Sequence, residues 1–216
     1  MTWFVRFYSS MPSRKGRRFA RLAFLILTSV GVAVAELPAA VVFEQLPDPR
    51  IFPGTSSTLS LGGRPGRRSA DDFNLSTDAE IIRVDWWGLH REFSSELDDF
   101  TFTFYDDAAG LPGNVLLETR ATVTSVPDGT IATLVDYSGV LYTPFARSAN
   151  ERYWVSIFNA APDAIWQWNN SFGLNGRSVQ SGLSPTSPWF EITGSGADVS
   201  VRLIAIPAAT SIPLAL

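Results

Sequence analysis

After residue 35, short runs of alternating hydrophobic and polar residues cover most of the chain, and none has the length or period of an amphipathic helix. In 100–105, for example, Phe100, Phe102 and Phe104 alternate with threonines, as in a strand with one buried face. The predicted strands are 71–76, 80–89, 100–105, 114–125, 131–142, 152–159, 164–169, 189–193 and 198–205. Many short strands separated by Gly and Pro predict an all-β fold, an antiparallel two-sheet sandwich that is jelly-roll-like.

The two faces of the strand 80–89 can be assigned in the same way. Its hydrophobic residues fall on one face and are expected to pack in the core: Ile82, Val84 and Trp86. The residues that alternate with them then face outward: Arg83, Asp85 and Trp87. Residues 54–70 alternate little and are expected to form a loop.

The first 35 residues have the pattern of a secretory signal peptide. Several basic residues precede the apolar run 22–35, which ends in the small residues of Ala33-Val34-Ala35. That run is shorter than the stretch of about 18 residues expected of a spanning helix, so no stable membrane span is expected in the mature chain. Met1 or Met11 could be the start. The predicted organisation is 1–35 signal peptide, 36–69 loop-rich start, 70–205 sandwich domain and 206–216 tail.

The parts of the chain before and after residue 35 differ in charge. Six of the 17 basic residues precede Glu36, whereas all 21 acidic residues follow Ala35, so the later part has a net charge of −10. Such a chain repels phosphate backbones, and nucleic-acid binding is not expected. The chain also has no cysteine, which excludes disulfides and thiolate metal sites.

Tryptophan is the most distinctive candidate for ligand binding, since an indole offers a flat surface on which a sugar ring can stack. Seven tryptophans are present. Those chosen as carbohydrate-binding candidates are Trp87, Trp166, Trp168 and Trp189. Core packing is the alternative for each of them, as expected for Trp86 and Trp154.

Aspartates near the predicted strand ends are the candidates for metal binding. Calcium prefers oxygen ligands, and jelly-roll modules often tie an early strand to the last one through a metal, which favours Asp71, Asp72 and Asp198. Adjacent aspartates also begin turns, and no D-x-D-x-D-G calcium loop is present. Calcium is therefore a possible cofactor, with a purely structural role of these residues as the alternative.

Catalytic motifs are weak. His90 is the only histidine, and no G-x-S-x-G motif is present, so a serine hydrolase is not expected. Glycoside hydrolysis needs only two suitably spaced carboxylates, and nothing in the sequence marks such a pair.

Five short motifs stand out along the chain: Ala70-Asp71-Asp72-Phe73-x-Leu75, Ile82-x-Val84-x-Trp86-Trp87-Gly88, Phe102-x-Phe104-Tyr105-Asp106-x-x-x-Gly110-Leu111-Pro112-Gly113, Tyr153-Trp154-Val155-Ser156-Ile157 and Trp166-x-Trp168. Together they resemble a group of bacterial secreted proteins that often carry a PEP-CTERM sorting tail. The resemblance implies export and a β-sandwich, but no activity and no catalytic residues. The tail 206–216 is similar to the start of such a sorting motif, without the apolar segment that normally follows.

Together these features predict a secreted, non-enzymatic β-sandwich, extracellular or at the cell surface, that binds extracellular polysaccharide or sits in an extracellular matrix. The alternative is a structural or adhesive cell-envelope protein with protein partners. A glycoside-active enzyme is the third possibility.

Overall fold

The computed structural model describes residues 38–48, 54–61, 63–91, 97–131, 133–171, 177–184, 186–192 and 198–208. Contacts along the chain separate Met1–Ala35 from Glu36–Leu216, and all described residues belong to the second unit. The predicted leader and most of the predicted tail lie outside them. Within the described ranges, no helix is long and apolar enough to cross a membrane.

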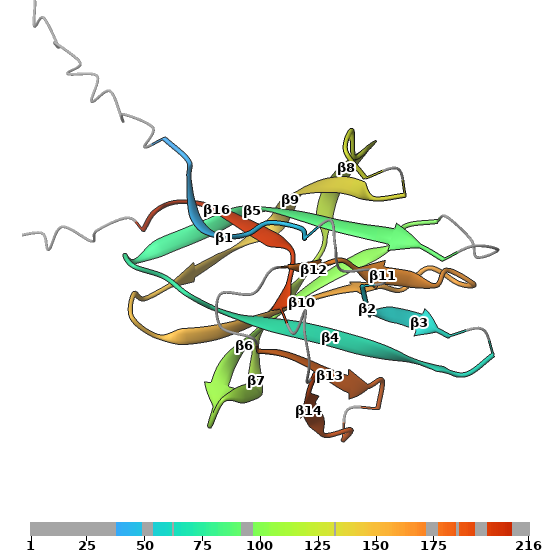
Figure 1. The fold of residues 1–216 in the computed structure, drawn as a ribbon. Coiled ribbons are helices and arrows are strands. Elements are labelled where there is room, and N and C mark those ends of the chain that lie inside the picture. The colour runs from blue at the N-terminus through green and yellow to red at the C-terminus, as the bar shows by residue number, and fades with distance from the viewer. Residues whose placement is uncertain are drawn as a thin grey trace, which may run out of the picture. The chain divides into compact units, whose positions relative to one another are not determined.

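The described residues form a β-sandwich of two seven-stranded sheets (Figure 1), which confirms the predicted fold class. Sheet I contains β1 (Ala40–Gln45), β2 (Thr55–Ser56), β5 (Ala79–His90), β8 (Ala121–Pro127), β9 (Val135–Arg147), β11 (Trp166–Trp168) and β16 (Val201–Pro207). Sheet II contains β3 (Thr58–Ser60), β4 (Pro65–Asn74), β6 (Phe100–Ala108), β7 (Leu111–Thr119), β10 (Arg152–Asn159), β13 (Ser178–Gly182) and β14 (Trp189–Glu191). A separate ladder joins β12 (Asn170–Ser171) to β15 (Asp198–Val199).

The chain crosses repeatedly between the sheets, as in a jelly roll. It passes from β4 in sheet II to β5 in sheet I, returns for the hairpin of β6 and β7, and crosses again for β8 and β9. Neighbouring strands are antiparallel except at the short contact between β10 and β3.

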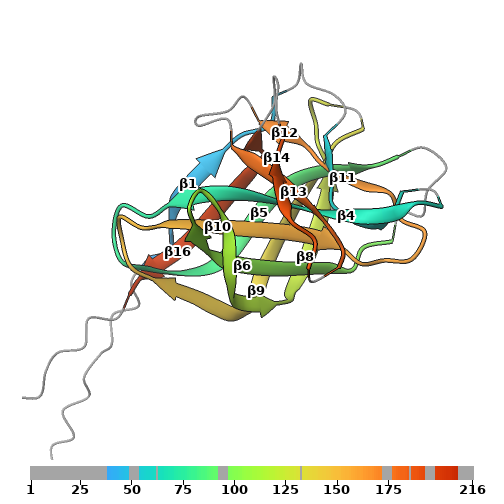
Figure 2. The same cartoon turned by 90° about the horizontal axis from the view of Figure 1, so that it is seen from below.

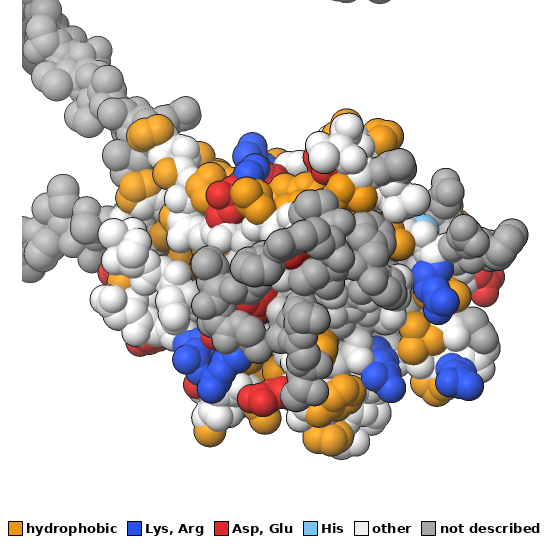
Figure 3. Space-filling view, in the orientation of Figure 1, with side chains coloured by type: hydrophobic (Ala, Val, Ile, Leu, Met, Phe, Trp, Pro, Cys, Tyr) orange, Lys and Arg blue, Asp and Glu red, His pale blue; other side chains and the backbone are white. Residues whose placement is uncertain are grey.

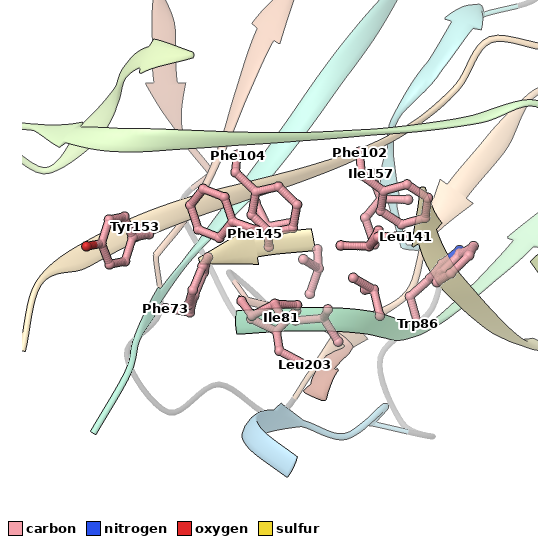
Figure 4. Close-up of a cluster of buried hydrophobic side chains, with 14 of the residues drawn as sticks. Phe73, Ile81, Trp86, Phe102, Phe104, Leu141, Phe145, Tyr153, Ile157 and Leu203 are labelled. Carbon is pink, nitrogen blue, oxygen red and sulfur yellow. The ribbon is translucent and has the colours of Figure 1, made fainter. Parts of the chain in front are cut away.

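Aromatic side chains from both sheets fill the space between them (Figure 4). Phe102 and Phe104 of sheet II point inward as predicted, and Phe104 stacks on Phe145 of sheet I at 4.2 Å between ring centroids. Trp86 stacks on Tyr137 at 5.2 Å. This aromatic layer explains how a chain without disulfides can hold the two sheets together.

Some strand predictions were wrong. A register shift between Ile81 and Arg83 puts Ile81, rather than the predicted Ile82, in the core, because a bulge reverses the alternation of faces. The predicted strand 114–125 is two strands in different sheets, and the expected loop 54–70 contains β2, β3 and the part of β4 from Pro65 to Ala70.

Sheet II curls until its distant edges meet. Trp189 of the edge strand β14 lies edge-to-face against Tyr105 of β6, with ring centroids 5.6 Å apart, although β13, β4, the short β3 and β10 separate the two strands in the sheet order. Strand β14 also contacts β7 at the opposite edge. Figure 2 shows β13 and β14 crossing over β10 and β6. The outer face of sheet II is therefore concave, and Ala70, Trp154 and Val179 form a second small core there.

Candidate functional site

Trp166 and Trp168 do not form the predicted exposed surface. They share one face of β11, as alternation requires, but β11 lies between β5 and β2 and this face belongs to the core. Both side chains are 0% exposed. The indole N–H of Trp168 donates to the Ser200 carbonyl at 2.8 Å, and the Trp166 ring occupies the space that a Cβ at Gly88 would need. Their role is packing.

Trp87 faces outward with Arg83 and Asp85 as predicted, yet it is only 8% exposed. Its ring packs against Leu89 and Leu134, and the Arg202 guanidinium lies over it, 5.5 Å from the ring centroid. The prediction of a platform formed by Trp87, Trp166 and Trp168 is therefore wrong.

Trp189 is the predicted tryptophan that remains accessible, since it is half-buried and lines a groove. We call this the aromatic groove; its volume is about 280 Å³, and its lining includes Arg68, Tyr105, Val115, Ser181, Ser184, Ser187 and Trp189. Hydrophobic side chains gather over β13 and β14 at the bottom of Figure 3. The groove thus lies where the two edges of the curled sheet II approach each other.

Strand register places the main groups of the aromatic groove in one row. Ser181 of β13 lies opposite both Arg68 of β4 and Trp189 of β14. Cross-strand neighbours on one face are close enough for their side chains to act together. A guanidinium, a hydroxyl and an indole are thereby brought to the same wall of the groove.

The polar groups of the aromatic groove are held by hydrogen bonds. Arg68 donates from Nη1 to the Tyr105 hydroxyl at 3.2 Å, and its guanidinium lies 5.4 Å from the Phe158 ring centroid. The buried Nε of Arg68 has no hydrogen-bond partner among the described residues. The Ser181 hydroxyl donates to the Ser187 carbonyl at 3.0 Å. An aromatic wall with a few fixed donors and acceptors is suited to a polar ligand that has one apolar face.

The sequence prediction missed Arg68 and Tyr105. Tyr105 follows the inward-facing Phe104, so alternation already indicated that it faces away from the main core. Nothing in the sequence indicated that sheet II curls and makes this outer face concave.

The three aspartates proposed for calcium do not converge. Asp71 and Asp198 are fully buried and close enough to interact electrostatically, but Asp72 points to the other face of β4 and pairs with Arg152 at 3.2 Å. Among the described residues, no group of three or more His, Asp or Glu side chains is arranged to hold a metal ion. The predicted three-aspartate site is therefore wrong, because adjacent strand residues face opposite ways.

Asp71 instead links the two sheets inside the sandwich. Its Oδ2 accepts a hydrogen bond from the Val199 backbone N–H at 2.9 Å. The side-chain amide of Gln45, oriented with its nitrogen toward Asp71, donates a second hydrogen bond to the same oxygen at 2.8 Å. Burial raises the pKa of the Asp71 carboxyl well above its usual value, and the nearby Asp198 and Asp72 raise it further, whereas the Val199 hydrogen bond opposes the shift. The carboxyl acts as a buried structural group.

His90 lies at the end of β5, where its Nε2 is 3.1 Å from Asp98 Oδ1. Asn159 donates to the same aspartate oxygen at 3.1 Å. No serine, threonine or tyrosine hydroxyl is hydrogen-bonded to the imidazole in the part of the chain that the structure describes. This arrangement ties the end of β5 to the segment before β6.

Comparison with known proteins identifies the family but no activity. No curated protein and no solved structure matches the chain significantly. One family model matches residues 41–204, which cover the strands from β1 to β16 except for the first residue of β1 and the last three residues of β16. The chain belongs to that family, described as "Domain of unknown function (DUF7901)".

Proposed function

We propose that the protein is a secreted, non-enzymatic module that binds a neutral carbohydrate in the aromatic groove. The observation that carries this proposal is the position of Trp189, which is held edge-to-face on Tyr105 but still lines an accessible groove beside Arg68 and Ser181. A sugar ring has an apolar face that can stack on the indole and hydroxyls that can bind the polar wall. The export pattern at the start of the chain is consistent with an extracellular glycan.

The most direct test is a glycan array with the full-length wild-type protein. Titration calorimetry then compares the wild type with Trp189→Ala and Phe190→Ala. Phe190 is the matched control, since it is an exposed aromatic residue on the same strand but contacts Arg67 rather than Tyr105. Trp189→Ala should weaken binding by about 1–3 kcal/mol, by analogy with the stacking of nucleic-acid bases on aromatic residues. Phe190→Ala should leave binding unchanged.

Equal losses in both variants would contradict the proposal, and so would unchanged binding in Trp189→Ala. The array should be run with calcium and with a chelator. We expect no calcium dependence, because Asp71, Asp72 and Asp198 do not form a common site.

A second candidate function is adhesion to a protein partner. Large hydrophobic side chains are exposed on the β8–β9 hairpin, namely Val126, Val140 and the 67%-exposed Tyr142. Exposed aromatic and aliphatic groups of this kind are typical of protein interfaces. Absence of binding to every glycan on the array would favour this candidate.

A further inference from the structure

A second groove lies on the outer face of sheet I, over β5, β8, β9 and β16, on the other sheet from the aromatic groove. We call it the arginine groove; its volume is about 260 Å³, and it is lined by Arg83, Asp85, Trp87, Thr124, Ser138 and Arg202, among others. Register aligns one polar row across five strands: Thr124, Ser138, Asp85, Arg202 and Glu44. Figure 3 shows basic and acidic side chains next to one another at the top of the view.

The acceptors of this row are already occupied within the protein. Asp85 Oδ1 accepts the Ser138 hydroxyl at 2.7 Å and lies 3.2 Å from Arg83 Nε. Asp85 Oδ2 lies 3.7 Å from Arg202 Nη1. Glu44 accepts a hydrogen bond from Arg202 Nε. These carboxylates hold the two guanidinium groups in place and have little capacity left for a ligand.

The donors are in excess. A guanidinium carries five N–H groups. The ion pairs just described use one nitrogen of Arg83 and two of Arg202, whose side chains remain 44% and 31% exposed. Thr124 of β8 also belongs to the lining. A polar row with free donors and occupied carboxylates favours a ligand that supplies acceptors, and the guanidinium fork matches the paired oxygens of a carboxylate or of a tetrahedral oxyanion.

A further contact fixes the position of one guanidinium in this groove. Arg202 lies over the Trp87 ring, which restricts the orientation of its guanidinium. The chain as a whole is acidic, with 21 acidic and 17 basic residues, so its net charge does not attract anions. An anion would therefore have to be bound by the local guanidinium groups.

We propose that the arginine groove binds an anionic group of an acidic saccharide, a carboxylate or a sulfate, through Arg83 and Arg202. This site is separate from the aromatic groove, and the inference does not depend on binding of neutral glycan there.

The test is titration calorimetry of the full-length protein with an oligogalacturonide, a sulfated galactan fragment and maltohexaose. The first two probes distinguish carboxylate from sulfate, and the third is the neutral control. The variants are Arg83→Gln, Arg83→Lys and the matched control Arg64→Gln, which removes an exposed arginine in the turn before β4. Arg83 is chosen because Asp85 retains Ser138 and Arg202 after its removal.

At least one anionic probe should bind and maltohexaose should not compete with it. Arg83→Gln should lower the affinity at least about tenfold, the effect of losing one charge-assisted hydrogen bond. Arg83→Lys should restore part of the affinity because it keeps the charge without the planar fork. Arg64→Gln should have no effect.

The proposal is overturned if neither anionic probe binds, or if Arg83→Gln and Arg64→Gln lower the affinity equally, which would indicate general charge attraction. Trp189→Ala separates this proposal from the previous one. It should leave the anionic probe bound, and loss of binding in that variant would assign the anion to the aromatic groove instead.

Discussion

Replacing Asp71 by asparagine should change how the stability of the protein depends on pH. The carboxyl is fully buried, and its pKa is raised mainly by burial, so the folded protein holds this proton at pH values where the unfolded chain has lost it. The stabilisation is fully present below the unfolded pKa of about 3.9 and is lost as the pH rises through the folded pKa. Wild-type stability should therefore fall above pH 4, relative to the variant.

The magnitude follows from linkage and from the hydrogen bonds of Asp71. One proton changes the free energy of unfolding by at most about 1.4 kcal/mol per pH unit between the two pKa values. Asparagine keeps one oxygen that can accept from Val199 and Gln45, but it does not ionise. Asp71→Ala instead leaves both donors unpaired, which should cost roughly 1–3 kcal/mol for each group at all pH values.

The assay is urea unfolding of wild type, Asp71→Asn and Asp71→Ala, followed by tryptophan fluorescence from pH 4 to 9. The difference between wild type and Asp71→Asn isolates this carboxyl from all other titrating groups. A difference that stays constant over the whole range would refute the reasoning, since it would mean that the pKa of Asp71 is the same in the folded and unfolded chain.

Two other predictions concern the interior. Trp168→Ala should lower the free energy of unfolding by about 3–5 kcal/mol, since it opens a large cavity and leaves the Ser200 carbonyl without its indole donor. Denaturant unfolding measures this loss, and a loss below about 1 kcal/mol would contradict a packing role of Trp168 in the core. Burial and the 2.7 Å hydrogen bond to Glu151 raise the pKa of Tyr153 to about 12, so ultraviolet titration of the folded protein should show a late phenolate transition. Tyr153→Phe should remove this transition. A titration curve of Tyr153→Phe identical to that of the wild type would contradict the prediction.

The alternation of hydrophobic and polar residues was sufficient to predict which side chains are buried in strands with one clearly apolar face. Phe102 and Phe104 alternate with threonines, and Val84 and Trp86 alternate with Arg83 and Asp85, so their faces could be predicted without the structure. A bulge between Ile81 and Arg83 broke this rule, because an inserted residue reverses the alternation without leaving a sequence signal.

The tryptophans show why the candidate site was only partly predictable. Alternation correctly placed Trp166 and Trp168 on one face of a strand, but it does not say whether that strand is central or at an edge. β11 lies between two other strands, so the shared face is in the core. Trp189 lies on an edge strand and keeps part of its surface accessible.

The aromatic groove itself depends on long-range geometry. Arg68, Tyr105 and Trp189 come from three strands that are distant in the chain, and the curl of sheet II brings them together. The separation of Asp71 from Asp72 was predictable in principle, since neighbours in a strand face opposite ways. It was missed because Asp71 was expected at a strand end, whereas β4 extends on both sides of it.

The central claim is that a neutral sugar stacks on Trp189. The most direct measurement is a crystal structure of the protein with the neutral oligosaccharide that binds most tightly on the array. The account predicts a sugar ring against the Trp189 indole, with hydroxyls hydrogen-bonded to Arg68 and to the serines of the aromatic groove. An oligosaccharide bound elsewhere, with the Trp189 indole free, would contradict it.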